Sequence, residues 1–204
     1  MNEKLQYIYS LYPDAKCELI YHNLFELVIA VSLSAQTTDK KVNLATKELF
    51  LKYPTIIDLA NADIEDVKRI VRPIGMVNVK SKNIIEIAKI IHNDFNDKIP
   101  NNKDLLMGLP GVGNKTANVV LAEGFKMNEF PVDTHINRVA KRLQLADVND
   151  LVEAVEAKLK KQIEPEMYLQ MHHSLIYFGR YMCKAISPDC LNCKLKESCN
   201  KNYK

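Results

Sequence analysis

The stretch that decides the fold is residues 105–122, LLMGLPGVGNKTANVVLA. A short apolar segment leads into the turn LPGVG, where Pro110 cannot continue a helix because it lacks an amide hydrogen and clashes with the preceding turn. Gly111 and Gly113 supply backbone freedom and allow a close approach that a Cβ atom would block. A second helix follows, with Lys115 in its first turn. The stretch predicts two helices joined by a tight turn, whose unpaired N–H groups and helix dipole suit a bound phosphate.

The composition is that of an ordinary globular chain. Its 204 residues are 47% hydrophobic and 26% charged, with a net charge of +3. This charge does not identify a nucleic-acid partner, so any basic patch must be local. No apolar run reaches 18 residues, and the N-terminus lacks the features of a secretory signal. We expect a monomer without a membrane segment that is cytoplasmic, and nucleoid-associated if its source is prokaryotic.

Hydrophobic periodicity is helical along almost the whole chain, and no convincing strand pattern occurs. The sequence therefore predicts an all-α fold with short connections. Thr38 or Asp39 can cap one of its helices. Besides the two helices of the opening stretch, the expected helices are residues 2–10, 23–34, 39 to about 51, 56–61, 64–71, 80–95, 134–143, 149–160 and 164–181.

Four cysteines close the chain with the spacing C-x6-C-x2-C-x5-C. They are Cys183, Cys190, Cys193 and Cys199. The surrounding residues are polar and cannot build an apolar core, so four thiolates converging on a metal centre are expected. Zinc accepts four thiolates, although zinc ribbons usually contain two C-x2-C pairs. An iron–sulfur cluster takes four cysteines with looser spacing. At this point zinc and iron–sulfur remain equally open, and nearby lysines such as Lys184 could reach phosphates.

Asp133 begins the segment DTHIN, a position typical of a helix N-cap. A capping aspartate can still present its second oxygen to a partner, and Lys115 lies 18 residues upstream. The positive end of a helix dipole, together with partial burial, would favour the free amine of that lysine. A free amine is a nucleophile that can form a Schiff base. The alternative interpretation is a lysine that only binds phosphate.

Three motifs in this order, LPGVGNKTANVVL, PVDTHINRV and the cysteine pattern, resemble the endonuclease III family of helix-hairpin-helix DNA glycosylases with abasic-site lyase activity. The resemblance extends from VIAVSLSAQTTD, residues 28–39, to the last cysteine. It implies two helical lobes with DNA in the cleft between them. One lobe is a helical barrel, residues 20–130, that contains the helix-hairpin-helix. The other, residues 1–19 plus 131–204, carries a C-terminal [4Fe–4S] cluster held by the four cysteines.

The resemblance also implies roles for single residues. Lys115 is expected to be the nucleophile and Asp133 the catalytic carboxylate. Met76 stands where the family usually has a leucine wedge, and Asn114 stands where a basic residue is common. The residues expected to contact DNA are Gln36, Met76, Leu109, Gly111, Gly113 and Lys184.

The implied function is removal of oxidised pyrimidines from duplex DNA, followed by strand cleavage 3′ to the abasic site through a lysine Schiff base. A damaged base inside a duplex has to be flipped out before it can react. Three alternatives are a monofunctional glycosylase, which lacks the lysine, a thymine-mismatch glycosylase, and a non-catalytic DNA-binding protein that uses the hairpin and a structural metal.

Overall fold

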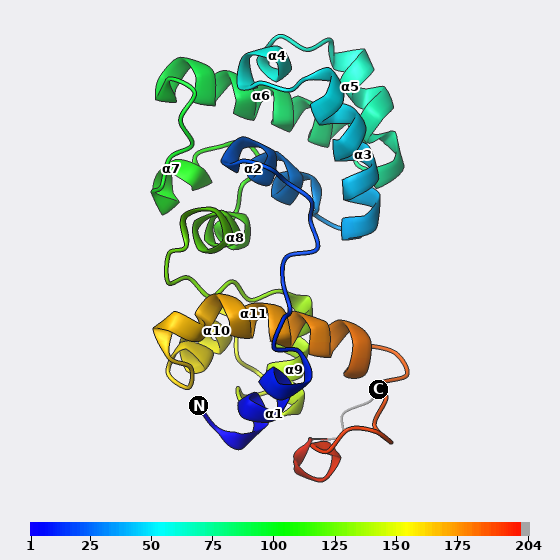
Figure 1. The fold of residues 1–204 in the computed structure, drawn as a ribbon, viewed down its shortest axis with the longest axis vertical. Helices are drawn as coiled ribbons and strands as arrows, with labels where there is room; N and C mark the ends of the chain where they lie inside the picture. The colour runs from blue at the N-terminus through cyan, green and yellow to red at the C-terminus, as the bar shows by residue number, and fades with distance from the viewer. Residues whose placement is uncertain (201–204) are drawn as a thin grey trace. The chain divides into compact units, whose positions relative to one another are not determined.

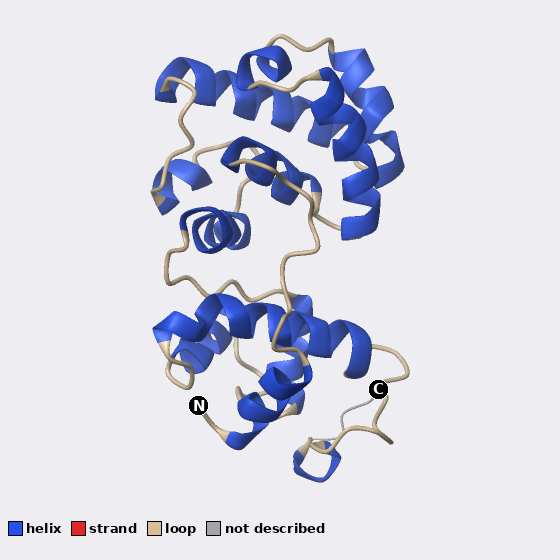
Figure 2. Ribbon diagram, in the orientation of Figure 1, coloured by secondary structure: helices blue, strands red, loops and turns tan. Residues whose placement is uncertain are grey.

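The structure, a computed structural model, describes residues 1–200 of the chain. Every regular element in that range is a helix, so the predicted all-α class is confirmed (Figure 2). Contacts divide the chain into two compact units. The central unit is Glu18–Phe125, and the terminal unit joins Met1–Cys17 to the chain from Lys126 onward.

The central unit is built around two helices, α2 (Leu24–Leu33) and α6 (Val77–Phe95) (Figure 1). α2 packs against α3, α6 and α8, while α4 and α5 cover α6. Eight of the ten residues of α2 are buried, which explains its almost continuous apolar sequence. The other elements of this unit are α3 (Asp39–Lys52), α4 (Ile56–Ala60), α5 (Ile64–Val71), the 3₁₀ helix η1 (Arg72–Ile74), α7 (Lys103–Met107) and α8 (Asn114–Phe125).

The terminal unit has its own apolar core, which includes the fully buried side chains of Phe130, Met171 and Phe178. α1 (Glu3–Leu11) packs against α11 (Tyr168–Tyr177). α9 (Thr134–Arg142) contacts α11, α10 (Val152–Lys160) and the π-helical segment η3 (Phe178–Met182). The short 3₁₀ helices η2 (Pro165–Met167) and η4 (Lys196–Ser198) complete the described part of this unit.

Local capping explains where many of the helices begin. Thr55 and Asp58 form a reciprocal capping box at α4. Thr38 occupies the N-cap position of α3, but its side chain makes no capping hydrogen bond and Asp39 lies inside the helix. The expected side-chain cap at this helix is therefore wrong. Side-chain oxygens of Asn2, Asn23, Asp63, Asn102 and Asp133 accept from backbone N–H groups at other helix starts.

Most predicted helix ends lie within one residue of the observed ends, and three predicted helices differ more. α6 begins at Val77 rather than residue 80, directly after Met76 in a left-handed conformation. α10 begins at Val152 rather than residue 149. The predicted helix 164–181 is a 3₁₀ turn, an α-helix and a π-helical segment in succession. None of the helices in residues 1–200 combines the length and apolar character needed to span a bilayer.

Candidate functional site

Two buried apolar side chains anchor the turn between α7 and α8 in the core. Leu109 and Val112 are 2% and 6% exposed, and the Val112 N–H donates to the Leu109 carbonyl oxygen at 3.1 Å. Gly111 has a φ of +75°, and a Cβ there would lie 2.4 Å from Nδ2 of Asn83 in α6. The positive φ favours glycine at this position, as the sequence predicts, and a Cβ would also displace the end of the Asn83 side chain.

Gly113 does not need to be glycine for the fold of the turn. Its φ is not positive, and a Cβ atom there would meet nothing within 4 Å. The predicted need for backbone freedom is therefore wrong for Gly113, whereas the predicted close approach of a ligand stays a prediction. The missing side chain instead leaves the outer surface of the turn open to an approaching molecule.

Lys115 lies in the first turn of α8, immediately after this hairpin. Its side chain is exposed, so the partial burial expected from the sequence is wrong. Within residues 1–200 the amine has no hydrogen bond or ion pair. The chain therefore presents an accessible lysine amine at a helix N-terminus.

Gln36 and Met76 share an unusual backbone conformation. Their φ values are +55° and +50°, and both side chains are exposed, Met76 at 50%. Residues other than glycine seldom adopt positive φ, but in residues 1–200 Asn96, Asp97, Lys126, Gln144 and Ser187 adopt it too, so the conformation alone does not identify a DNA contact. The central unit thus presents both residues from turns that place them in a strained conformation.

Asp133 caps α9 in the terminal unit. Its Oδ1 accepts from the Ile136 N–H at 2.8 Å, which confirms the N-cap interpretation. Oδ2 makes no hydrogen bond within residues 1–200, so one carboxylate oxygen stays available. The preceding segment is held in place because Nδ1 of the buried His172 donates to the Pro131 carbonyl at 2.8 Å.

The four cysteines Cys183, Cys190, Cys193 and Cys199 line one small cavity in the terminal unit. Burial raises the pKa of the Cys193 and Cys199 thiols, and the neighbouring cysteines raise it further. Four thiols suit either an iron–sulfur or a zinc centre, and Asp189 and Lys196 also line the cavity. In residues 1–200 no three cysteine, histidine or carboxylate side chains converge on the position of a single metal ion.

Two arginines of α9 that the sequence analysis missed hold the cysteine loop. Arg142, 7% exposed, donates from Nη1 to Cys183 Sγ at 3.5 Å and to the Lys184 carbonyl at 2.7 Å. Arg138 donates to the carbonyls of Gly179 and Cys183. The Lys184 side chain itself is exposed. Arg138 and Arg142 are four residues apart and therefore lie on one face of α9. This spacing is the sequence signal that could have indicated a shared binding role.

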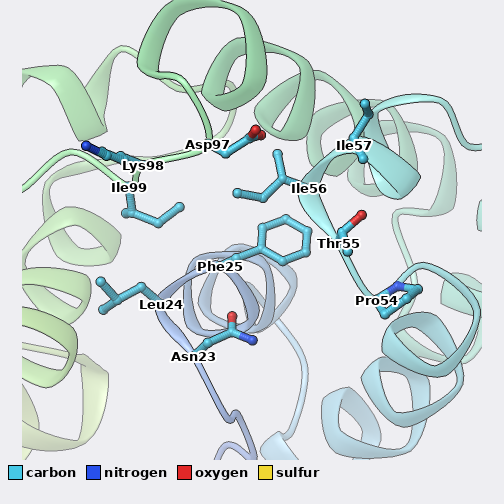
Figure 3. A pocket seen from close by; sticks show the side chains of 10 residues that line it. All are labelled: Asn23, Leu24, Phe25, Pro54, Thr55, Ile56, Ile57, Asp97, Lys98 and Ile99. Atoms are coloured by element: carbon cyan, nitrogen blue, oxygen red, sulfur yellow. The ribbon is translucent and has the colours of Figure 1, made fainter.

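A cavity of about 800 Å³ lies in the central unit. The apolar side chains of Phe25, Ile56 and Ile99 point toward one another there (Figure 3). None of the residues predicted to act on DNA lines it.

Comparison with known proteins identifies the family. Residues 29–165 match the HhH-GPD superfamily of base excision DNA repair proteins. The chain is 44% identical over 200 residues to endonuclease III of Bacillus subtilis, covering 98% of this chain and 91% of that protein. The chain belongs to the endonuclease III family. The predicted family and fold are thereby confirmed.

Solved structures of endonuclease III agree with this assignment. A non-covalent endonuclease III–DNA complex superposes with a TM-score of 0.94 at 44% identity, covering 97% of this chain and 92% of that one. A trapped covalent endonuclease III–DNA intermediate gives 0.93 at 44% identity, with coverage of 96% and 92%. As a member of the endonuclease III family, the chain is a base-excision-repair DNA glycosylase and abasic-site lyase acting on oxidised pyrimidines. The predicted activity is thus confirmed, whereas the roles of individual residues stay predictions.

Proposed function

We propose that Lys115 is the nucleophile of both the excision and the strand-cleavage reactions. The observation that carries this proposal is its exposed amine at the start of α8, directly after the hairpin and without an intramolecular partner in residues 1–200. An amine is the side-chain group that forms a Schiff base with a sugar carbon.

In the proposed reaction, the neutral amine attacks C1′ of the damaged nucleotide. The N-glycosidic bond breaks, and the base leaves with the bonding electron pair and takes up a proton. The amine loses a proton, the C1′–O4′ bond opens, and O4′ is protonated, which gives a protonated Schiff base. Loss of a 2′ proton then leads to cleavage of the C3′–O3′ bond. The oxygen O3′ and its bonding electron pair leave with the phosphate group of the strand on the 3′ side. Water then hydrolyses the Schiff base and frees Lys115.

Asp133 is the catalytic carboxylate in this proposal. Oδ1 is fixed by the N-cap bond to Ile136, which leaves Oδ2 as a rigidly held base. This oxygen accepts the proton that the Lys115 ammonium has to lose and stabilises positive charge that develops on the sugar.

The partner is duplex DNA containing damaged pyrimidines or abasic sites. Leu109, Gly111 and Gly113 form the turn that binds a backbone phosphate, because their backbone lies at the N-terminus of α8. Gln36 fills the gap left by the flipped nucleotide, and Met76 acts as the apolar wedge. Lys184 adds a phosphate contact from the cysteine loop.

A [4Fe–4S] cluster bound by Cys183, Cys190, Cys193 and Cys199 is proposed for the terminal unit. The support is the cavity that all four cysteines line and the guanidinium of Arg142 beside Cys183, which offsets thiolate charge. When bound, this group stabilises the fold of the loop, and no step of the reaction passes through it. An iron-to-protein ratio near four with visible charge-transfer absorption supports the cluster, whereas one zinc in a colourless protein refutes it.

The functional lobes are proposed to be residues 20–130 and residues 1–19 with 131–204. We also propose that the protein acts as a monomer in the cytoplasm and, if its source is prokaryotic, on nucleoid DNA. Sedimentation with and without a duplex that contains an abasic-site analogue tests the monomer.

Borohydride trapping tests the role of Lys115. The protein is mixed with a duplex carrying one oxidised pyrimidine, and borohydride reduces the Schiff base to a stable covalent adduct. Lys115→Ala should lose both the adduct and strand cleavage while still binding the duplex.

Lys103→Ala is the matched control, because Lys103 begins α7 of the same hairpin. It should retain the adduct. An adduct that persists in Lys115→Ala would refute the assignment. Wild-type protein that binds the duplex without forming any adduct would favour the non-catalytic DNA-binding alternative.

A further inference from the structure

Lys80 is a buried lysine that the proposed reaction does not use. It lies in the first turns of α6 and is only 5% exposed. Its ammonium donates to a single acceptor in residues 1–200, the carbonyl oxygen of Ile74, at 3.1 Å. Burial lowers the pKa of Lys80, and the positive end of the α6 dipole also disfavours a cation there. Burying an ammonium group costs free energy unless hydrogen bonds or an opposite charge compensate for the lost water. The contact with the Ile74 carbonyl is therefore important for this side chain.

The segment that Lys80 contacts is the turn that presents Met76. Gly75 has φ +74° and ψ 174°, a region open essentially to glycine alone. Met76 follows with φ +50° and ψ 38°. Two consecutive residues thus have positive φ, and a turn of this kind persists only where its surroundings fix it.

Lys80 fixes this turn from both ends. Its side chain binds the carbonyl of Ile74, the residue before Gly75, at 3.1 Å. Its backbone N–H binds the carbonyl of Met76, the residue after Gly75, at 2.9 Å. Ile74 is itself 4% exposed, so the far end of the turn is anchored in the core. One residue therefore brackets the strained pair and leaves only the Met76 side chain to project.

We propose that Lys80 is a positioning residue that holds Met76 in the conformation required for insertion into the DNA duplex. The proposal rests on the DNA role proposed above for Met76. The backbone contact of Lys80 survives any substitution except proline. The side-chain contact is therefore the part that the identity of the residue controls, and a charged donor makes it a strong one.

The test measures insertion without requiring chemistry. The duplex contains a tetrahydrofuran abasic-site analogue with 2-aminopurine next to it, and the fluorescence of 2-aminopurine rises when an inserted side chain unstacks it. The variants are Lys80→Met, which keeps bulk but removes the donor, and Lys80→Arg, which keeps a charged donor. Lys89→Met is the matched control, because Lys89 is an exposed lysine of the same helix.

Lys80→Met should lose most of the fluorescence rise and slow single-turnover excision of an oxidised pyrimidine about tenfold, as expected for loss of one charge-assisted hydrogen bond. Lys80→Arg should recover most of both signals, and Lys89→Met should match the wild type. Thermal unfolding checks that each variant is folded. If Lys80→Met does not fold, Lys80→Gln replaces it, because its shorter side chain does not reach the Ile74 carbonyl.

A double-mutant cycle with Met76→Ala distinguishes the positioning role of Lys80 from the insertion role of Met76. In the Met76→Ala background, Lys80→Met should have no further effect on excision. An equal slowing in both backgrounds would overturn the positioning role and leave Met76 in place. A wild-type fluorescence signal in Met76→Ala would instead refute the insertion role of Met76, and the positioning role with it.

Discussion

The guanidinium of Arg142 lies 3.5 Å from Sγ of Cys183. The same side chain also donates to the carbonyls of Lys184 and Ala185, so one buried arginine supports three consecutive residues of the cysteine loop. This places a positive charge where thiolates would gather and gives the loop a fixed attachment to α9.

Replacing this arginine should loosen the loop. Arg142→Met should lower the free energy of unfolding by about 3 kcal/mol, because charged hydrogen bonds are lost and carbonyls are left without donors. Urea unfolding measures the loss, and metal content per chain should fall with it. Lys141→Met, a change at the adjacent position of α9, should leave both quantities unchanged. Full metal content in Arg142→Met would contradict the supporting role.

The two glycines of the hairpin should respond differently to alanine. Gly111→Ala should destabilise the protein by about 2 kcal/mol, because of the positive φ and the contact with Asn83. Gly113→Ala should leave thermal unfolding unchanged and weaken binding to duplex DNA, because its Cβ would project only outward. Equal melting temperatures for both variants would contradict this distinction.

The contact with Asn83 can be separated from the backbone strain. Adding Asn83→Ala to Gly111→Ala should recover part of the lost stability, because the truncated side chain makes room for the new Cβ. The remaining loss measures the cost of the positive φ. No recovery at all would show that the contact contributes nothing.

Asp133→Asn should separate catalysis from capping. Asparagine caps a helix about as well as aspartate, so the variant should unfold at nearly the wild-type temperature. Excision should slow by at least about 100-fold, because the amide cannot accept the ammonium proton. Single-turnover kinetics with an oxidised pyrimidine measure the rate. An unfolded Asp133→Asn would assign the residue to capping, and unchanged excision would remove it from the reaction.

An ion-pair cluster in the central unit should govern its acid stability. The ammonium of Lys52 and the hydroxyl of Tyr53 each donate to Oδ2 of Asp66 at 2.7 Å, and Arg69 donates to Oδ1. The hydrogen bond from Lys52, followed by those from Tyr53 and Arg69, lowers the pKa of Asp66 well below its usual range. Because the folded pKa lies below the unfolded value of about 3.9, the stabilisation is complete above that pH and is lost as the pH falls below it.

Asp66→Asn should therefore destabilise the protein near neutral pH by an amount that shrinks as the pH falls below about 4. Urea unfolding at a series of pH values measures this difference. Asp94→Asn, a change at an exposed position of α6, should give no pH-dependent difference. A constant gap between wild type and Asp66→Asn down to pH 3 would contradict the shift.

Most of the fold could be predicted because its determinants are local. The apolar periodicity of α2 and the caps at Asn23 and Asp133 act within a few residues, so the sequence shows them directly. The predicted start of α6 is wrong because Met76 adopts a left-handed conformation that no local sequence pattern indicates. The breakdown of the last long helix into 3₁₀, α and π segments was likewise not visible as a change in periodicity.

The sequence indicated only some of the residues of the candidate site. Motif order indicated Lys115, Asp133 and the cysteines, whose individual roles stay predictions. The exposure of Lys115 depends on packing, and the expectation of burial was wrong. Arg142 contacts residues more than 40 positions away, which no local pattern reveals.

The helix α9 carries Asp133 at its first end and Arg142 at its last. Its nine residues span about 13 Å, and its buried face fixes it against the core of the terminal unit. The carboxylate proposed for catalysis and the arginine that holds the cysteine loop thus lie at opposite ends of one helix. Any displacement of α9 therefore moves the proposed catalytic carboxylate and the support of the cysteine loop together.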